Sequence, residues 1–444
     1  MRGRQLAPLT RATLILVLSL VLCGCARQTS SNPLVGTPGG QSGIPNIVQP
    51  GPNPEKWIEL QVQSIDSFAR LVRGYRDSLW IIDHTRIIQL SYSGQAQTYA
   101  IPSGLNGYQI TEGPRGLMWF CEYGGSGESM IASISPRTGA IREYPIPGPL
   151  GPNEGETIGA GADGKLWFGA GPGHIGSMTP DGTFAFYPTP NTDLVQSLIA
   201  GPDGNVWTVN DNSPSESSAY RIAPDGSMTA YQLPVSPQTG GTCPIQIISG
   251  PEGSMYYTDP CSQWVALLST SGTVAATYPS PHSPFFLTSD DISRVFFTAL
   301  PPVHTGHERG YLGVLDTLNG TTSYRIAPQE GMRMASMAFG ADGNIWMMPA
   351  SSPWEVVVFV RLVMDVSPST ISFSGAGQSQ QIVVSEKHYS GTWSATSEDA
   401  SVATVQPGGT SGIFVVTGTG AGSTSIDIAD KRHNDFLVQV SVGP

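Results

Sequence analysis

The stretch Gly201-Pro-Asp-Gly-Asn-Val-Trp207 decides the fold of this chain, because variants of it recur along most of the sequence. Near copies are Gly161-Ala-Asp-Gly-Lys-Leu-Trp167 and Gly340-Ala-Asp-Gly-Asn-Ile-Trp346. Asp and Gly favour a tight turn, since Gly accepts positive φ and the Asp side chain bonds to nearby backbone. Apolar residues follow the turn in each copy. The stretch therefore predicts a β-hairpin whose second strand carries an aromatic residue.

Seven aromatic residues mark the copies of this unit: Trp80, Trp119, Trp167, Trp207, Tyr256, Phe296 and Trp346. They follow one another at about 44 residues, which is the period of a propeller blade of four strands. The composition agrees, because 53 glycines and 37 prolines supply turns, and only 13% of the residues are charged. An ordinary soluble domain has roughly 25% charged residues. We predict an all-β chain with a seven-bladed β-propeller over residues 55–365.

The two ends of this propeller are predicted to meet in its last blade. After Trp346 only one further strand follows, over 355–362. The segment Trp57–Val62 precedes the first aromatic anchor and has no hairpin partner of its own. We predict that this N-terminal strand completes the last blade, because such closure removes a free sheet edge.

Residues 1–25 are expected to direct export. Arginines precede the apolar run Ala12–Cys23, which is too short to span a bilayer comfortably. The run ends in Leu22-Cys23-Gly24-Cys25, which resembles the lipobox of bacterial lipoproteins and implies a lipid on Cys25. An ordinary secretory signal is the alternative. Residues 26–54, rich in Gly, Pro and Ser, are expected to form a flexible linker. We expect an extracytoplasmic protein held in the outer membrane or at the cell surface.

Residues 366–444 break the period and predict a second domain. Six or seven short strand candidates in about 80 residues are typical of a small β-sandwich. The opening Val366-Ser-Pro, the central Trp393 and the run Ser401-Val-Ala-Thr-Val405 resemble bacterial Ig-like domains of group 2. That resemblance implies a spacing or adhesive role, and no catalytic motif is visible in this region.

The cysteines outside the signal predict one disulfide. Cys243 and Cys261 lie symmetrically about the turn Gly250-Pro-Glu-Gly253, so antiparallel pairing places them opposite one another. An oxidising compartment favours a bridge, although two free thiols are the alternative. Cys121 alternates with Leu117 and Trp119 and is expected to be a small buried apolar group.

The net charge bears on possible partners. A formal charge of −12 at pH 7 argues against a nucleic-acid partner, because phosphate contacts require clustered cations. We expect a monomer that contacts a membrane through its lipid.

The amino-acid sequence of the repeats resembles that of the virginiamycin B lyases, also known as streptogramin lyases. The resemblance rests on Ile110–Glu122, with its Trp-Phe-x-Glu ending, on Ile131–Pro147 and on Ile175–Gly182, and it extends over roughly 65–365. It implies a propeller that opens a cyclic depsipeptide by elimination at its ester, with Mg²⁺ and with His and Glu side chains near the central channel. Glu122 matches the Glu of the family motif. The resemblance therefore implies a role for Glu122 as an acid/base group or on the metal side, and a polar residue at a strand end is the alternative.

The family's histidine precedes a Gly-x-Asp-Gly turn, and the equivalent segments here contain no His. They are Gly107–Ile110, Gly155–Ile158, Val195–Leu198, Pro244–Ile247, Pro284–Leu287 and Met334–Met337. Two hypotheses therefore stay open. The first is a surface lipoprotein whose propeller binds a small molecule, peptide or glycan on its loop face without catalysis, and the second is a Mg²⁺-dependent lyase. A glycan or lactone hydrolase has no positive motif.

The remaining candidate residues are histidines. His174 precedes the third strand of the third blade and is a second candidate catalytic residue. His304 and His307 lie in the long loop 299–310 and are candidate metal ligands together with Glu122. Pro301, Pro302 and Gly306 favour a loop there, so the spacing of the two histidines gives only a weak indication of a metal site.

Overall fold

The computed structural model describes a chain built from β-strands. It describes residues 56–60, 69–75, 78–124, 127–147, 154–171, 173–190, 195–210, 217–301, 309–327, 333–349, 356–360, 364–386, 392–430 and 435–444. Within these ranges the strands form nine four-stranded sheets, and the helical elements are the short 3-10 turns η2 (Pro114–Gly116) and η3 (Pro251–Gly253). The all-β prediction is confirmed.

Seven of the sheets follow one another along the first part of the chain. The first three contain β2 (Arg70–Gly74), β3 (Ser78–Asp83), β4 (Arg86–Ser91), β5 (Ala96–Ala100), then β6 (Asn106–Gly113), β7 (Leu117–Tyr123), β8 (Ser129–Ile134), β9 (Ile141–Pro145), then β10 (Glu154–Ala160), β11 (Leu166–Ala170), β12 (His174–Met178) and β13 (Phe184–Pro188). The next three contain β14 (Ser197–Ala200), β15 (Val206–Asn210), β16 (Ser218–Ile222), β17 (Met228–Gln232), then β18 (Gln246–Ser249), β19 (Met255–Asp259), β20 (Trp264–Leu268), β21 (Val274–Pro279), then β22 (Ser283–Ser289), β23 (Arg294–Leu300), β24 (Tyr311–Asp316) and β25 (Thr321–Ile326). In each sheet, strands that are consecutive in the chain are antiparallel neighbours.

The seventh sheet joins the two ends of this region. It contains β26 (Met334–Phe339), β27 (Ile345–Pro349), β28 (Val356–Val360) and β1 (Lys56–Leu60), in the order β1-β28-β27-β26. Strand β1 pairs antiparallel with β28, with Trp57 opposite Phe359. The pairing predicted for the N-terminal segment is therefore present, and it supplies the fourth strand of this sheet.

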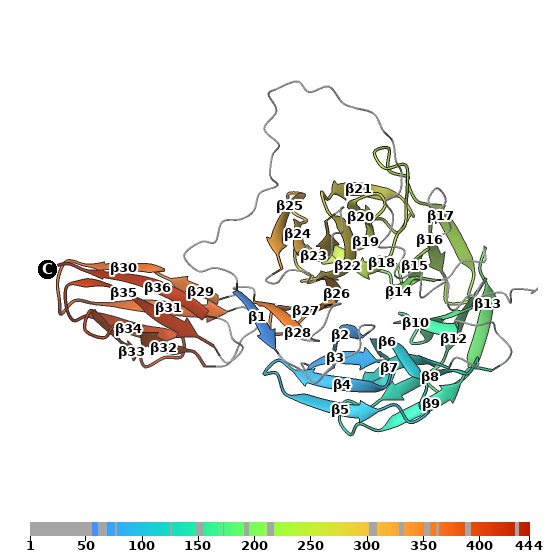
Figure 1. The fold of residues 1–444 in the computed structure, drawn as a ribbon, viewed down its shortest axis with the longest axis horizontal. Helices are drawn as coiled ribbons and strands as arrows, with labels where there is room; N and C mark the ends of the chain where they lie inside the picture. Colours follow the sequence, from blue (N-terminus) through green and yellow to red (C-terminus); the bar gives the residue numbers. More distant parts are fainter. Residues whose placement is uncertain are drawn as a thin grey trace, which may run out of the picture.

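The sheets are arranged as a ring (Figure 1). The first strand of each of the first six sheets lies nearest the centre and its last strand near the rim, and in the seventh sheet β26 lies nearest the centre and β1 near the rim. An innermost strand has an edge whose backbone groups need partners. Side chains of the preceding sheet supply them: Ser336 Oγ accepts from Leu71 N at 3.0 Å, Thr288 Oγ1 from Phe339 N at 3.0 Å, Gln246 Oε1 from Leu287 N at 2.6 Å, Gln109 Oε1 from Ile158 N at 3.0 Å, and Ser197 Oγ from Ile247 N at 3.1 Å. These bonds join neighbouring sheets around the centre.

The aromatic anchors pack in the spaces between neighbouring sheets. Trp119 is fully buried and stacks on Tyr144 of the outer strand of its own sheet, at 5.8 Å between centroids. Tyr144 in turn lies against Gly182 of the next sheet, where an added Cβ would come within 2.7 Å of the ring. Gly182 also has a φ of +94°, so the position favours glycine for its backbone as well. The pattern links each sheet to its successor.

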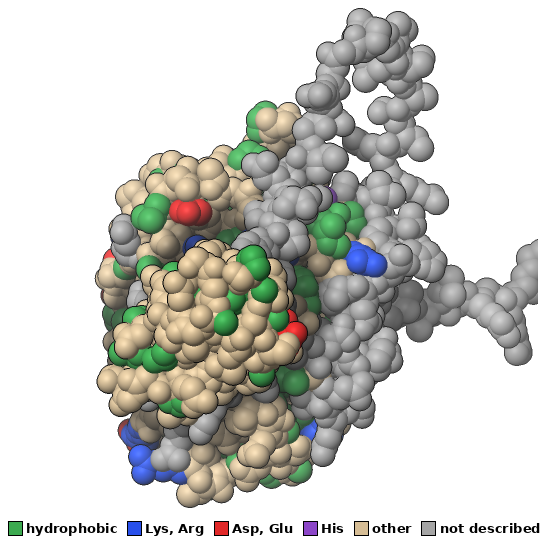
Figure 2. Space-filling view, turned by 90° about the vertical axis from the view of Figure 1, so that its left-hand side faces the viewer, with side chains coloured by type: hydrophobic (Ala, Val, Ile, Leu, Met, Phe, Trp, Pro, Cys, Tyr) green, Lys and Arg blue, Asp and Glu red, His purple; other side chains and the backbone are tan. Residues whose placement is uncertain are grey.

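The C-terminal region forms a separate two-layered structure, at the left in Figure 1. Its sheets are β29 (Met364–Ser367), β31 (Ser379–Glu386), β34 (Ile413–Gly418) and β33 (Ala403–Pro407), and β30 (Thr370–Phe373), β36 (Asp435–Val442), β35 (Gly422–Ala429) and β32 (Ser394–Ser397). Both sheets contribute to one core, for example through Ile382 and Ile428, which are fully buried. Figure 2 shows this part at the front, with few charged and only scattered apolar side chains on its surface.

The segment that contains the predicted opening Val366-Ser-Pro is divided between two strands. Strand β29 ends at Ser367 and β30 begins at Thr370, and the two strands belong to different sheets. Pro368 lies between them and lacks a backbone N–H for a ladder, which accounts for the break.

The segments predicted as signal and linker, 1–25 and 26–54, lie outside the described residues, and Cys25 lies there with them. Within the described ranges, no helix has the length and apolar character required to cross a membrane.

Candidate functional site at the loop face

One face of the ring carries the candidate residues. This loop face is formed by the turns between second and third strands and by the connections from one sheet to the next. Glu122 is the next-to-last residue of β7, and His174 is the first residue of β12, so topology places both at this face. They lie in different sheets.

Glu122 faces the interface between two sheets. It alternates with Met118 and Phe120, whose side chains pack in one cluster with Trp80 and Ile82 of the preceding sheet. Glu122 is fully buried. Its Oε2 accepts a hydrogen bond from the Ser103 hydroxyl, and no donor among the described residues reaches Oε1.

A second carboxylate shares the same serine. The backbone N–H of Ser103 donates to Glu143 Oε1 at 2.8 Å, from the outermost strand of the Glu122 sheet. Burial raises the pKa of Glu122 to about 7, the Ser103 hydrogen bond partly opposes this, and the negative charge of Glu143 raises it further. At neutral pH the protonated and ionised forms of Glu122 are therefore both accessible.

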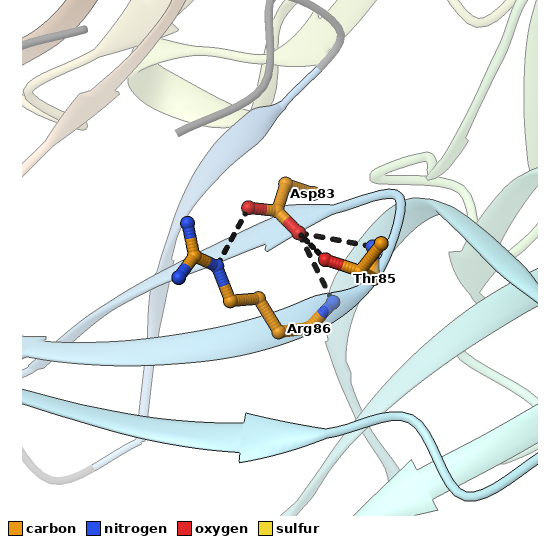
Figure 3. A network of polar contacts seen from close by, with 3 residues as sticks. All are labelled: Asp83, Thr85 and Arg86. Atoms are coloured by element: carbon orange, nitrogen blue, oxygen red, sulfur yellow. Dashed lines mark hydrogen bonds and ion pairs between the residues drawn. The ribbon is translucent and has the colours of Figure 1, made fainter. Parts of the chain in front are cut away.

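Two other sheets have a carboxylate at the same repeat position, three residues after the aromatic anchor. Asp83 Oδ1 accepts from the backbone N–H groups of Thr85 and Arg86 at 3.0 Å, and Oδ2 accepts from Arg86 Nε at 2.9 Å (Figure 3). These bonds fix the turn between β3 and β4. The position therefore serves to hold loops on this face.

Asp259 holds loops in the same way and has both oxygens bonded. Oδ1 accepts from Cys243 N and Ser262 N, each at 2.9 Å, and Oδ2 accepts from the hydroxyls of Thr242 and Ser262 at 2.7 and 2.8 Å. Asp259 thus joins the connection before β18 to the turn after β19. Glu122 differs because a single hydroxyl is its hydrogen-bond donor among the described residues.

The disulfide lies beside Asp259. Cys243 and Cys261 are bridged, with their Cα atoms 5.4 Å apart. The register of β18 and β19 places Gln246 opposite Thr258, and the same symmetry about the turn brings the two cysteines together. Cys121 forms no disulfide within the described residues and is fully buried, in agreement with its predicted apolar role.

The predicted histidines do not join Glu122 in a described cluster. His174 is exposed at the start of β12, whereas Glu122 faces the sheet β2–β5 on the other side of its own sheet. His304 and His307 lie outside the described residues. In the part of the chain that the structure describes, no three His, Cys, Asp or Glu side chains are grouped as metal ligands. Mg²⁺ takes oxygen ligands in octahedral geometry, commonly one or two carboxylates with water, and among the described residues Glu122 is not part of a cluster of three such side chains.

Four of the six segments equivalent to the family's histidine segment are distorted at the loop-face end of the inner strands. Register shifts occur between Gly107 and Gln109 in β6 and between Pro284 and Leu287 in β22. Two further inner strands, β10 and β26, shift between Glu154 and Ile158 and between Met334 and Ser336. Such bulges redirect side chains and occur often beside functional sites. Here they carry Tyr108, Phe285 and Phe286.

Phe286 lies on β22, the innermost strand of its sheet, and packs half-buried against the apolar cluster that this sheet shares with β26 and β27. Its backbone N–H donates to Thr298 Oγ1 at 3.1 Å, and the next N–H, of Leu287, donates to Gln246 Oε1. The guanidinium of Arg70, from the first residue of β2, lies 5.6 Å from the centroid of the Phe286 ring. Burial lowers the pKa of Arg70. Sequence reasoning noted the segment 284–287 for lacking His but missed its aromatic residues, because only the bulge brings them to the centre.

Further rings lie at the same face. His84 and Tyr108 have centroids 5.3 Å apart, and Tyr108 and Tyr123 are 6.3 Å apart. His282 stacks on Tyr311 at 3.8 Å in the connection before β22. Aromatic rings therefore accompany the carboxylates described above at the loop face.

The family model described as the virginiamycin B lyase family matches residues 55–353. The chain belongs to the virginiamycin B lyase family. No curated protein matches the sequence. A streptogramin B lyase structure is 23% identical with a TM-score of 0.57, covering 68% of this chain and 96% of that one. Virginiamycin B lyase from Staphylococcus aureus is 20% identical with a TM-score of 0.56, covering 69% and 99%.

A further structure is similar to this family member. It is a catalytically inactive virginiamycin B lyase from Staphylococcus aureus, with a histidine replaced by alanine and with quinupristin, 21% identical at a TM-score of 0.57, covering 69% of this chain and 99% of that one. At this identity the likenesses show a shared β-propeller fold. The predicted virginiamycin B lyase-like propeller is confirmed at this level.

Proposed function

We propose that this family member is a lipid-anchored, extracytoplasmic protein whose seven-bladed propeller binds a ligand at the loop-face end of its centre without cleaving it. The observation that carries the proposal is that none of the six segments equivalent to the family's histidine segment contains His, and that one of them, Pro284–Leu287, has aromatic residues instead. In that segment Phe286 lies against Arg70, and its backbone is held by Thr298 and Gln246. A rigid aromatic ring contributes binding energy at a low entropic cost.

The surroundings of Glu122 favour the ligand-binding proposal over an elimination reaction. A general base must come within hydrogen-bond reach of the proton that it removes. Glu122 is fully buried, its only described donor is Ser103, and its repeat position holds loops in two other sheets. A structural neighbour with quinupristin is a catalytically inactive variant in which a histidine is replaced, and no His lies in the segments of this chain equivalent to the family's histidine segment.

A Mg²⁺-dependent lyase is the second candidate, because the chain belongs to a family named for that activity and Glu122 matches its motif. For this reading the missing base would come from another part of the loop face, such as His174 or the segment with His304 and His307. Two remaining parts of the proposal rest on the sequence. The first is that Cys25 carries a lipid, and the second is that the C-terminal sandwich is an Ig-like domain that acts as a spacer.

Quinupristin is the probe that separates the two candidates. Binding is measured by calorimetry, and the ligand is recovered after incubation with and without Mg²⁺. We expect binding of intact quinupristin, with at least about tenfold weaker binding by Phe286→Ala, corresponding to the loss of one aromatic contact of about 1.4 kcal/mol.

Each alternative predicts a different product. Elimination opens the ring at unchanged mass and shifts its chromatographic position, whereas hydrolysis adds one water. Val383→Ala is a matched control, because Val383 is exposed on the sandwich, remote from the ring. Ring opening that depends on Mg²⁺ would establish the lyase. Equal binding by wild type and Phe286→Ala would exclude the centre as the binding site.

A further inference from the structure

The two ends of the chain that forms the ring lie on one face of it. Strand β27 begins at Ile345, directly after the turn 340–344, and Ile345 lies opposite Phe359 of β28. Lys56, the first residue of β1, lies opposite Val360, the last residue of β28. Strand β1 therefore begins, and β28 ends, beside a turn between the first and second strands of a sheet. We call the face formed by such turns, and by the turns between third and fourth strands, the turn face; it is opposite the loop face.

The connections from the ring to the rest of the chain start at this turn face. The sandwich begins at Met364, shortly after Val360, and it lies beside the ring, next to β1 and β28 (Figure 1). On the other side, residues 26–55 lead from Cys25 to β1. A flexible chain of about 30 residues has a root-mean-square span of about 30 Å. A lipid on Cys25 would therefore keep the turn face close to the membrane, and this step rests on the proposed function.

Two exposed apolar side chains lie on the turn face of the sheet β22–β25. Leu318 is 76% exposed in the turn between β24 and β25, and Ile292 is 45% exposed in the turn between β22 and β23. Within the described part of the ring, they are the two most exposed large apolar side chains. A hydrogen bond from Phe339 N to Thr288 Oγ1 joins this sheet to the sheet that contains β1. The apolar pair is therefore next to the sheet from which the predicted linker starts.

Other sheets have polar residues at these two positions. Ile292 lies four residues before its aromatic anchor, where Asp203 accepts a hydrogen bond from Trp207 Nε1 at 3.0 Å. The anchor after Ile292 is a phenylalanine without a ring N–H, so an acid is not required there. Leu318 lies two residues before the glycine of its turn, as Arg137 does in the turn between β8 and β9. Packing within the ring does not account for the apolar residues, because both side chains are exposed.

The backbone of the two turns is fixed by hydrogen bonds. Asp290 Oδ1 accepts from the N–H groups of Ile292 and Arg294 at 3.0 and 2.9 Å. The N–H and the hydroxyl of Thr317 both donate to Ser293 O, at 2.8 and 2.9 Å, which joins one turn to the other. A partner that covers the pair therefore has little backbone to order, and the cost of binding is correspondingly low.

We propose that Ile292 and Leu318 contact the apolar layer of the membrane that holds the lipid of Cys25, so that the turn face lies on the lipid surface and the loop face points away from it. The anchor keeps the lipid surface at a high effective concentration, so a small apolar contact suffices. Asp291 and Asp316 are next to the pair in the chain, which favours a zwitterionic surface over an anionic one.

Fluorescence quenching in vesicles tests the contact. The full chain with its lipid is inserted into phosphatidylcholine vesicles that contain a spin-labelled phosphatidylcholine. A fluorophore is attached at Asn319→Cys on the turn face, or at Val235→Cys in the connection from β17 to β18 on the loop face. Among the described cysteines, Cys121 is buried and Cys243 is bridged to Cys261, so the introduced thiol is the reactive one. We expect quenching of the label at 319 and only background quenching at 235.

A double variant shows whether the apolar pair makes the contact. With Ile292→Ser and Leu318→Ser combined, quenching at 319 should fall to the level at 235. Val383→Ser is the matched control, because Val383 is an exposed apolar residue of the sandwich, and it should leave the quenching unchanged. The melting temperature of the double variant should equal that of the wild type, since both replaced side chains are exposed. Equal quenching at 319 and 235, or undiminished quenching in the double variant, would overturn the contact.

Flotation of the vesicles distinguishes failure of the contact from failure of the anchor. A chain that floats with the vesicles but shows only background quenching at 319 keeps its anchor and refutes the contact. A chain that does not float refutes the lipid anchor, and the contact is refuted with it. A blue shift of the label at 319 in the absence of vesicles would show that a second copy of the chain covers the pair, and would also overturn the proposal.

Discussion

Glu122 and Asp259 occupy the same position in their sheets, three residues after the buried aromatic of the second strand, but only Asp259 has both carboxylate oxygens bonded. Both side chains point to the preceding sheet and hold the connection that arrives from it. The repeat therefore places a carboxylate where it can fasten a loop, and the neighbouring residues decide whether the acid is satisfied. Four predictions follow from this and from the packing of the sheets.

The stability of the protein should fall as pH rises through the titration of Glu122. The ordinary pKa of this carboxyl is 4.5 and the folded value is about 7, so between these values the folded state binds more proton than the unfolded state. The wild type should lose at most about 1.4 kcal/mol per pH unit in that window and nothing further above it. Urea unfolding of wild type and Glu122→Gln measures this, and parallel pH curves for the two proteins would contradict it.

Asp259→Ala should destabilise the protein strongly. The substitution leaves the buried N–H groups of Cys243 and Ser262 without their acceptor, which should cost about 2–4 kcal/mol. Asp225→Ala is the control, because Asp225 is an exposed acid in a hairpin turn whose hydrogen bonds are to nearby Ser227. The free energy of unfolding should change little for that variant. Equal losses in both would refute a loop-holding role for Asp259.

Gly226→Ala and Gly204→Ala separate steric clash from backbone strain. Both glycines have positive φ, +86° and +78°. A Cβ at Gly226 would lie 2.0 Å from the Tyr187 ring, whereas a Cβ at Gly204 would have nothing within 4 Å. We expect about 1–2 kcal/mol of destabilisation for Gly204→Ala from strain, and about 1–3 kcal/mol more for Gly226→Ala from overpacking. Thermal unfolding measures the destabilisation of both variants. A smaller loss of stability in Gly226→Ala than in Gly204→Ala would show that the Tyr187 ring does not obstruct a side chain at position 226.

Deleting residues 55–64 should lower the melting temperature sharply. The deletion removes β1, which pairs with β28 from Lys56 to Leu60, and exposes a new edge in the sheet that joins both ends of the ring. A deletion of similar length within 26–54, predicted as linker, is the control and should leave the melt unchanged. An unaltered melting temperature after removal of 55–64 would show that β1 is dispensable for closure.

Much of the fold could be predicted because its determinants are local and repeated. The turn residues before Trp207 and the alternation of buried residues around Cys121 act over a few positions, so each can be recognised in the sequence. The pairing of β1 with β28 followed from counting strands. The opening Val366-Ser-Pro does not show that β29 and β30, on either side of Pro368, belong to different sheets, because the partner of a strand is not written in its local pattern.

The candidate site was less predictable, because it depends on residues far apart in the chain. Ser103 and Glu143 are 40 residues apart, and no local pattern brings them together. Phe286 reaches Arg70 only because β22 is bulged and the ring closes. Such contacts arise from packing between sheets.

The sequence by itself determined the all-β architecture, the aromatic anchors and the turn-centred symmetry that joins Cys243 to Cys261, since hairpin geometry is set by neighbours along the chain. Only the tertiary structure decided which acid is satisfied. Asp259 and Glu122 share a repeat position, yet their donors come from connections that the sequence leaves unconstrained. The physical reason is that burial and hydrogen bonding, which fix the pKa of a carboxyl, depend on what the next sheet places beside it.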